Sequence, residues 1–205
     1  MDAKNKYLLV IPSVFIVVLL LLLIDFRILV FVQQFITPEL KYVGKILSKK
    51  GLFLLYGIFL LLFIYALINK NQKLKKIFLV YLKVQILFSF ALVRIMKIVF
   101  GRARPKIGSE FTFFSLEADY NSFPSGHSAD AFVSGIFLFY LLKNSKYSAY
   151  RYLPLLYAAT IALSRIVVNA HFPSDVLAGA AIGVFGAWFY LNRLSKQADQ
   201  CLCRF

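Results

Sequence analysis

Long apolar runs separated by short basic or polar segments are the main feature of this sequence. Most runs approach the length of about 20 residues that a helix needs to cross the hydrocarbon of a bilayer, where backbone groups must pair within the helix. The pattern therefore predicts an all-α, polytopic membrane protein, a bundle of six transmembrane helices. The expected spans are residues 7–24, 51–69, 77–100, 128–142, 153–168 and 176–191.

The first apolar run follows Lys4 and Lys6, an arrangement that is also typical of signal peptides. The run is longer than the apolar part of such peptides, and Asp25 follows it in place of the small residues of a cleavage site. We therefore expect an uncleaved first transmembrane helix. Residues 26–50 alternate apolar and basic positions, which favours an interfacial amphipathic segment.

Composition narrows the class of partner. The chain is 60% hydrophobic and carries a formal net charge of +15. In a soluble protein this charge would suggest a nucleic acid, but here most basic residues flank apolar runs, so the expected partner is a lipid bilayer and no nucleic acid. No repeat or linker interrupts the chain, which favours a single domain over residues 1–205. The sequence does not specify an oligomeric state.

The basic residues also predict an orientation. Half of them lie at the amino terminus, in residues 70–76 and 143–151, and in the tail that holds Cys201 and Cys203. The margin over the opposite side is modest, because the first outer segment also carries Lys41, Lys45, Lys49 and Lys50. Positively charged segments stay in the cytoplasm, so the opposite ends of the helices should face outward. The two cysteines lie in that tail and indicate neither a disulfide framework nor a metal site.

Unusual polar residues gather in three segments that the helix count places together at the outer face of the bundle. Two cations end the third span, a short polar motif opens the fourth, and a further cluster joins the last two spans. These residues are Lys97 and Arg104; Ser125, Gly126 and His127; and Ser164, Arg165, His171 and Asp175. We expect the active site at this face.

The cations of these segments suit a phosphate group. The guanidinium groups of Arg104 and Arg165 can bind phosphate oxygens in a bidentate way, and Lys97 adds a third positive charge. Backbone N–H groups at the start of a helix near residue 125 can bind an anion as well. These charges make a metal ion or cofactor unnecessary, so none is expected. Arg102 and Lys106, in contrast, are expected to extend to lipid headgroups.

The two histidines of the chain supply the chemistry. His171 and Asp175 are four residues apart, so a helical turn between them would let the carboxylate accept a hydrogen bond from one ring nitrogen. The other nitrogen would then be free to attack phosphorus as a nucleophile. His127, on another helix, can protonate the departing lipid oxygen as a general acid.

Two further residues have open interpretations. Asp130 would lie on the same helix face as His127, where it would either hold the imidazolium or be a helix-start carboxylate favoured by the dipole. Arg94 lies one turn before Lys97 and would either extend the phosphate site or form an internal ion pair. The ion pair is the favoured interpretation, because buried charges in membranes are usually paired.

The three segments resemble the signature of the type 2 phosphatidic acid phosphatase family. Lys97 to Pro105 reads K-x6-R-P, Pro124 to His127 reads P-S-G-H, and the last segment reads S-R-x5-H-x3-D. The resemblance implies a six-helix fold, a phosphohistidine intermediate at His171 and a leaving-group acid at His127. It also implies that the phosphoryl oxygens are held by Lys97, Arg104, Ser125, Gly126, Ser164 and Arg165.

The substrate is only weakly specified by the sequence. The G-R-A-R-P form of the first motif resembles lipid A 1-phosphatases of the bacterial inner membrane, with a site that faces the periplasm or exterior. Undecaprenyl diphosphate and phosphatidylglycerophosphate phosphatases are the alternatives. A haloperoxidase with the same anion site would be soluble, which the hydropathy argues against. A non-catalytic lipid-binding or transport protein would not need both histidines.

Overall fold

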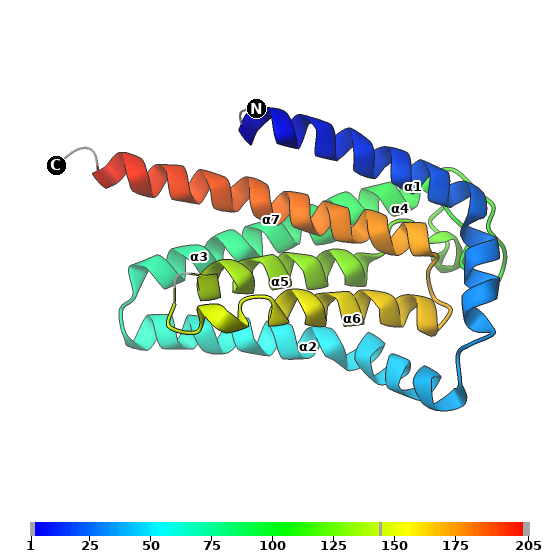
Figure 1. Cartoon of the computed structure of the whole chain (residues 1–205), viewed down its shortest axis with the longest axis horizontal. Helices are drawn as coiled ribbons and strands as arrows, with labels where there is room; N and C mark the ends of the chain where they lie inside the picture. The colour runs from blue at the N-terminus through cyan, green and yellow to red at the C-terminus, as the bar shows by residue number, and fades with distance from the viewer. Residues whose placement is uncertain (1–2, 144, 203–205) are drawn as a thin grey trace.

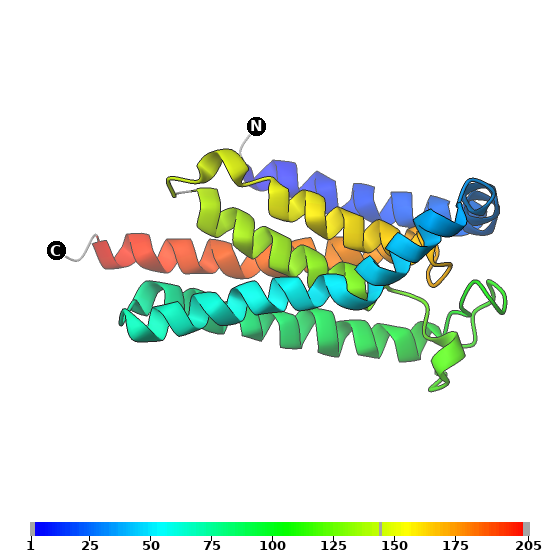
Figure 2. The same cartoon turned by 90° about the horizontal axis from the view of Figure 1, so that it is seen from below.

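The computed structural model describes residues 3–143 and 145–202, which form six long helical segments that run side by side (Figure 1, Figure 2). The single helices are α1 (Ala3–Gln33), α2 (Pro38–Ile68), α5 (Gly126–Lys143), α6 (Leu153–Val167) and α7 (Pro173–Leu202). The remaining segment is continuous and consists of α3 (Gln72–Val84), the π-helical η1 (Gln85–Leu92) and α4 (Val93–Phe100). The predicted all-α bundle is confirmed. Cys203 and the side chain of Cys201 lie outside the described residues.

Four of the helical segments are long and apolar enough to cross a membrane. They are Ile16–Gln33, Pro38–Ile68, Gln72–Phe100 and Pro173–Leu194. Their outward sides carry exposed apolar side chains, for example Leu23 at 81% and Phe53 at 72% exposure. Apolar surface of this extent is stable against lipid rather than water, so the chain is an integral membrane protein. The other two helices, α5 and α6, are shorter, with 18 and 15 residues.

Helix α1 ends later, and α2 begins earlier, than the apolar runs suggest. The N-cap of α2 is Thr37, whose side chain accepts a hydrogen bond from the Leu40 N–H at 3.3 Å, and Pro38 follows in the first helical turn. Both residues are typical of helix starts. Residues 26–50 are therefore divided between two helices and do not form one separate helix, and the end of α1 lies across the end of the bundle, as an interfacial segment would (Figure 1). They form the last turns of α1 and the first turns of α2 (Figure 1).

Helix α5 lies in the middle of the bundle and packs against α6 and α7 (Figure 1). Two glycines of α7 allow its close approach to α5. A Cβ atom at Gly179 would lie 2.2 Å from the Ser125 carbonyl oxygen, and one at Gly183 would lie 2.4 Å from the Ala129 carbonyl oxygen. Small residues spaced four apart allow such backbone contact between membrane helices. This contact sets the first turn of α7 against the first turn of α5.

Three connections lie at one end of the bundle, on the right in Figure 1: residues 34–37, 101–125 and 168–172. The longest of them begins at Gly101, which ends α4 in the left-handed conformation with φ of 49°. A Cβ atom there would lie 1.7 Å from the Thr112 carbonyl oxygen, so only glycine fits. The turn directs the following residues, including Arg102, back into the bundle.

Candidate active site

The polar residues singled out in the sequence come together at this end of the bundle. Lys97 belongs to α4, His127 to the first turn of α5, Arg165 to the last turn of α6, and His171 to the connection before α7. His127 lies within electrostatic reach of His171, Lys97, Arg104 and Arg165. Three segments distant in the sequence therefore surround one small region.

His171 and Asp175 form the buried centre of the cluster. Helix α7 begins at Pro173, so the two residues are joined by the helical turn that their spacing predicted. The Nδ1 atom of His171 lies 3.5 Å from Oδ2 of Asp175, a close polar contact without hydrogen-bond geometry. Such contacts often tighten only when substrate binds. The same Oδ2 accepts hydrogen bonds from the Ser122 hydroxyl at 2.5 Å and the Phe172 N–H at 2.9 Å.

The environment of His171 keeps its ring neutral. Burial lowers the pKa of His171 from 6.5 to about 4, against the opposing effect of the Asp175 carboxylate. Desolvation disfavours the imidazolium, and the neighbouring cations Lys97 and Arg165 act in the same direction. A neutral imidazole at pH 7 has a free lone pair, which is the state that a nucleophile requires.

Arg102 is the main correction to the sequence-based interpretation. It does not extend to lipid headgroups, because its side chain is only 1% exposed and lies between two carboxylates. Its Nη1 atom is 2.6 Å from Oδ1 of Asp175 and 3.0 Å from Oδ2 of Asp25. Its guanidinium also lies over the Phe172 ring, 4.0 Å from the ring centroid. Asp25 in turn accepts hydrogen bonds from the N–H and the hydroxyl of Ser174.

The buried cluster Asp25–Arg102–Asp175 connects α1 to the proposed nucleophile. One feature of the sequence indicates this cluster. Asp25 lies inside the apolar span Ile16–Gln33, where an ionisable residue normally has a partner and a function. The identity of its partner could not be inferred, because 77 residues separate the two side chains and only the fold brings them together.

The three cations predicted to bind phosphate are each anchored by a neutral oxygen. The Lys97 ammonium donates to the Asn121 carbonyl, Nε of Arg104 donates to the Ala118 carbonyl at 3.2 Å, and Nη1 of Arg165 donates to the hydroxyl of Ser48. No carboxylate forms an ion pair with these three side chains in the described part of the chain. Their charges are therefore not neutralised by an ion pair and are available to an anion.

Ser125 and Ser164 of the motifs are buried, Gly126 is partly buried, and the two serines bond to neighbouring protein groups. The Ser125 N–H donates to the Asp175 carbonyl at 2.9 Å, and its hydroxyl is bonded to that of Ser128 at 2.9 Å. The Ser164 hydroxyl donates to the Ile161 carbonyl at 2.6 Å, so its proton is already used within α6. Gly126 begins α5. The structure thus shows these residues beside the cluster but does not show their hydroxyls directed at an anion.

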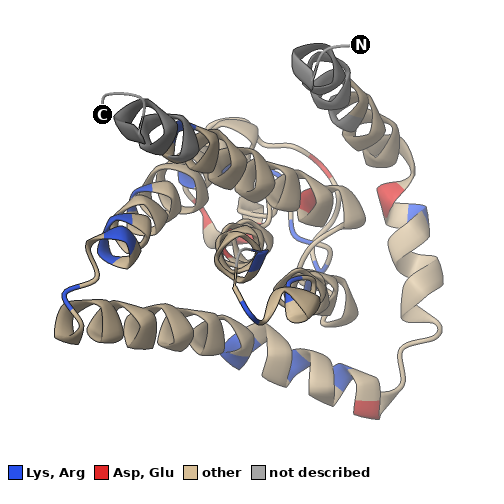
Figure 3. Cartoon of the chain, turned by 60° about the vertical axis from the view of Figure 1, so that its left-hand side comes forward, with Lys and Arg blue, Asp and Glu red and all other residues tan. Residues whose placement is uncertain are grey.

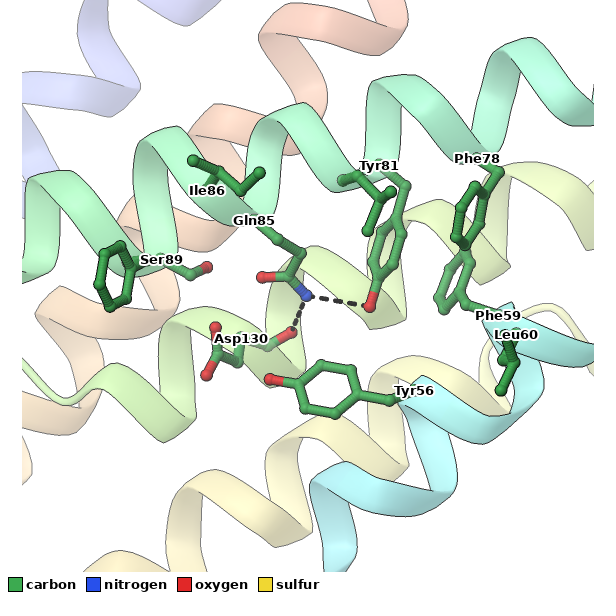
Figure 4. A pocket seen from close by; sticks show the side chains of 11 residues that line it. Tyr56, Phe59, Leu60, Phe78, Tyr81, Gln85, Ile86, Ser89 and Asp130 are labelled. Carbon is green, nitrogen blue, oxygen red and sulfur yellow. Dashed lines mark hydrogen bonds between the residues drawn. The ribbon is translucent and has the colours of Figure 1, made fainter. Parts of the chain in front are cut away.

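Asp130 and Arg94 lie apart from this cluster. The Asp130 carboxylate is directed toward the Tyr56 hydroxyl in an apolar pocket of about 360 Å³ between α2 and the α3–η1 segment, where Gln85 donates to the Asp130 carbonyl (Figure 4). It therefore does not hold the His127 ring. Arg94 is exposed, and the ion pair expected for it is not among those of the described residues.

These features define a class of protein: a helical membrane protein with a buried histidine–carboxylate pair beside several cations. The model of the PAP2 superfamily matches residues 77–199, and the chain belongs to that superfamily. This finding confirms the resemblance that the three motifs indicated. The match includes every predicted site residue from Arg94 to Asp175 and excludes Asp25.

Similar proteins and structures agree with this assignment. The chain is 39% identical over 116 residues to the lipid A 1-phosphatase of Rhizobium etli, an alignment that covers 54% of this chain and 47% of that protein. The chain spans about half the length of such curated relatives. It resembles the crystal structure of Aquifex aeolicus LpxE with a TM-score of 0.60, 26% identity and coverage of 82% and 95% of the two chains.

A second solved structure shares the fold. The phosphatidylglycerolphosphate phosphatase of Bacillus subtilis, a transmembrane PAP2 protein, superposes with a TM-score of 0.65 and 24% identity. The alignment covers 90% of this chain and 96% of that one. At this identity the similarity concerns the fold alone.

Proposed function

We propose that the protein is a membrane lipid phosphatase that works through a phosphohistidine intermediate at His171. The observation that carries the proposal is the buried His171–Asp175 pair, with a neutral ring, beside cations that form no ion pair with a carboxylate of the described residues. A cationic cluster at a bundle end recognises a phosphate group, and a neutral imidazole within it is placed to attack phosphorus. Membership of the PAP2 superfamily supports the same activity.

The proposed reaction has two steps. Nε2 of His171 attacks phosphorus, the bond from phosphorus to the lipid oxygen breaks, and His127 gives a proton to that oxygen. Burial and the nearby cations lower the pKa of His127 to about 4, so His127 must take up this proton when the negatively charged phosphate of the substrate binds beside it. Water then attacks the phosphohistidine, His127 takes the proton of the water, and free phosphate leaves. Lys97, Arg104 and Arg165 stabilise the charge that develops on the phosphoryl oxygens, so the mechanism requires no metal ion.

The proposed substrate is a phosphorylated glycolipid of the lipid A type. Relatives from Rhizobium etli and Porphyromonas gingivalis carry the name lipid A 1-phosphatase, and the second shares 40% identity over 88 residues, which cover 43% of this chain and 17% of that protein. Undecaprenyl diphosphate and phosphatidylglycerophosphate are the alternatives that an activity panel must include.

A panel of lipid phosphates assayed in chelator tests this function. The purified protein should release phosphate at the same rate with and without EDTA, because side chains supply the positive charge. Vanadate should inhibit, since it adopts the five-coordinate geometry of the transition state. Release from none of the lipids would contradict the function. Complete loss in EDTA that a divalent ion restores would contradict the metal-free mechanism.

We further propose that the protein lies in a bacterial inner membrane with this site facing the exterior. The amino terminus, residues 70–76, residues 143–151 and the tail hold a surplus of basic residues on the opposite side. Cys201 and Cys203 provide the test. A membrane-impermeant thiol reagent should leave both unlabelled in intact cells and label them after lysis. Labelling without lysis would mean the opposite orientation.

A further inference from the structure

A second cationic pocket adjoins the proposed catalytic cluster. It has a volume of about 590 Å³, within the range of about 300–1,000 Å³ that is typical of small-molecule sites. Arg104 and Arg165 line one part of it, and these two residues also belong to the phosphate-binding cluster. The two regions therefore share a wall.

Three lysines also line this pocket and have no role in the proposed reaction. They are Lys45 and Lys49 of α2 and Lys106 of the loop after α4. Together with the two arginines they place five cations around the pocket, against one carboxylate, that of Asp119. Figure 3 shows the basic positions along the first turns of α2. This surplus of positive charge is more than one transferred phosphate group requires.

Packing fixes the position of the two α2 lysines. Lys45 and Lys49 are four residues apart, so their side chains lie on one face of the helix, where like charges repel unless an anion separates them. Between them, the buried Ser48 accepts a hydrogen bond from Nη1 of Arg165. One residue before Lys45, a Cβ atom at Gly44 would lie 2.8 Å from Cγ1 of Val167. The lysine face is thus held against the end of α6 beside Arg165.

We propose that this lysine pocket binds a second phosphate group on the headgroup of the same substrate, so that the protein prefers bisphosphorylated to monophosphorylated glycolipids. The inference rests on the proposed function, because it assumes that the first phosphate occupies the cluster around His171. Two phosphates of one headgroup would then be bound on the two sides of Arg104 and Arg165. A general contact of the lysines with anionic headgroups of the bilayer is the competing explanation.

Binding in a background without turnover separates these explanations. Affinity is measured for His171→Gln protein in neutral detergent, with a bisphosphorylated glucosamine-disaccharide lipid and its analogue that has only the 1-phosphate. Adding Lys45→Gln and Lys49→Gln should weaken binding of the bisphosphorylated lipid about tenfold, since the two exposed ion pairs of these lysines with the second phosphate are removed. The affinity for the 1-phosphate analogue should stay within about twofold. The matched control is Lys41→Gln with Lys50→Gln, two exposed α2 lysines outside the pocket, which should change neither affinity.

The proposal would be overturned if the substitutions weakened the binding of both lipids equally, or if they changed the affinity for neither lipid. An equal effect of the control pair would also overturn it, because it would mean that the lysines act through the general charge of α2. Failure of the proposed function would be seen in a different measurement, the release of phosphate. In that case the unsubstituted protein would release no phosphate from either lipid, whatever the two affinities are.

Discussion

Replacing His171 with glutamine is expected to reduce phosphate release to background on every lipid, a loss of about 10⁴-fold or more. Glutamine keeps a polar side chain of similar length but has no nitrogen lone pair that can attack phosphorus. His171 is 3% exposed and its partner Asp175 is fully buried, so water cannot easily replace the missing ring. Steady-state phosphate release from the lipid panel measures the effect.

His127→Gln is the control, because it should fail in a different way. The variant loses a proton donor, whose contribution is about 10²–10⁴-fold and depends on the leaving group. Release from phosphatidic acid, which expels an alkoxide, should fall far more than release from a diphosphate lipid, whose leaving group is more stable. If His127→Gln affects all lipids equally while His171→Gln retains activity on some, the two roles are assigned wrongly.

Removal of Arg102 is expected to have the second largest effect. Arg102→Met keeps most of the side-chain volume but leaves Asp25 and Asp175 buried without their shared cation. Breaking a buried pair in this way costs about 3–5 kcal/mol of folding stability. Activity should fall about 10²-fold or more as well, since Asp175 loses the contact that positions it against His171. Thermal unfolding in detergent and phosphate release measure the two effects.

A second substitution distinguishes positioning from simple stability. Adding Asp25→Asn to Arg102→Met removes one uncompensated carboxylate and should restore part of the stability. It should not restore activity, because Asp175 still lacks its cation. Asp25→Asn alone should be milder than Arg102→Met, since the 2.6 Å pair of Arg102 with Asp175 remains. Arg102→Met protein as stable and active as the unsubstituted chain would contradict this role.

Much of this site could be predicted from the sequence because lipid makes polar residues conspicuous. In a chain that is 60% hydrophobic, a histidine or a cluster of arginines within or beside the membrane spans indicates a functional site. Helix count alone places Lys97, His127 and His171 at one end of a bundle, and the spacing of His171 and Asp175 predicts their shared turn. Family membership of residues 77–199 then agrees with the motifs.

What could not be predicted depends on contacts between distant segments. Nothing local shows that Arg102 turns inward, because its direction is set by the left-handed turn at Gly101 and by two carboxylates on other helices. Helical spacing predicts that Asp130 lies beside His127, yet its carboxylate is directed toward Tyr56 of α2 (Figure 4). Residues 26–50 do not form one element, for a simpler reason. A short turn capped by Thr37 divides it between two long helices.

Direct detection of the phosphoenzyme tests the central claim. His127→Gln protein is mixed with ³²P-labelled lipid phosphate, quenched in alkali within milliseconds to seconds, and digested for mass spectrometry. The account predicts label on the peptide that contains His171, stable in alkali and lost in acid, and no label when His171→Gln is added. Label on any other residue, or label that persists without His171, would contradict the account.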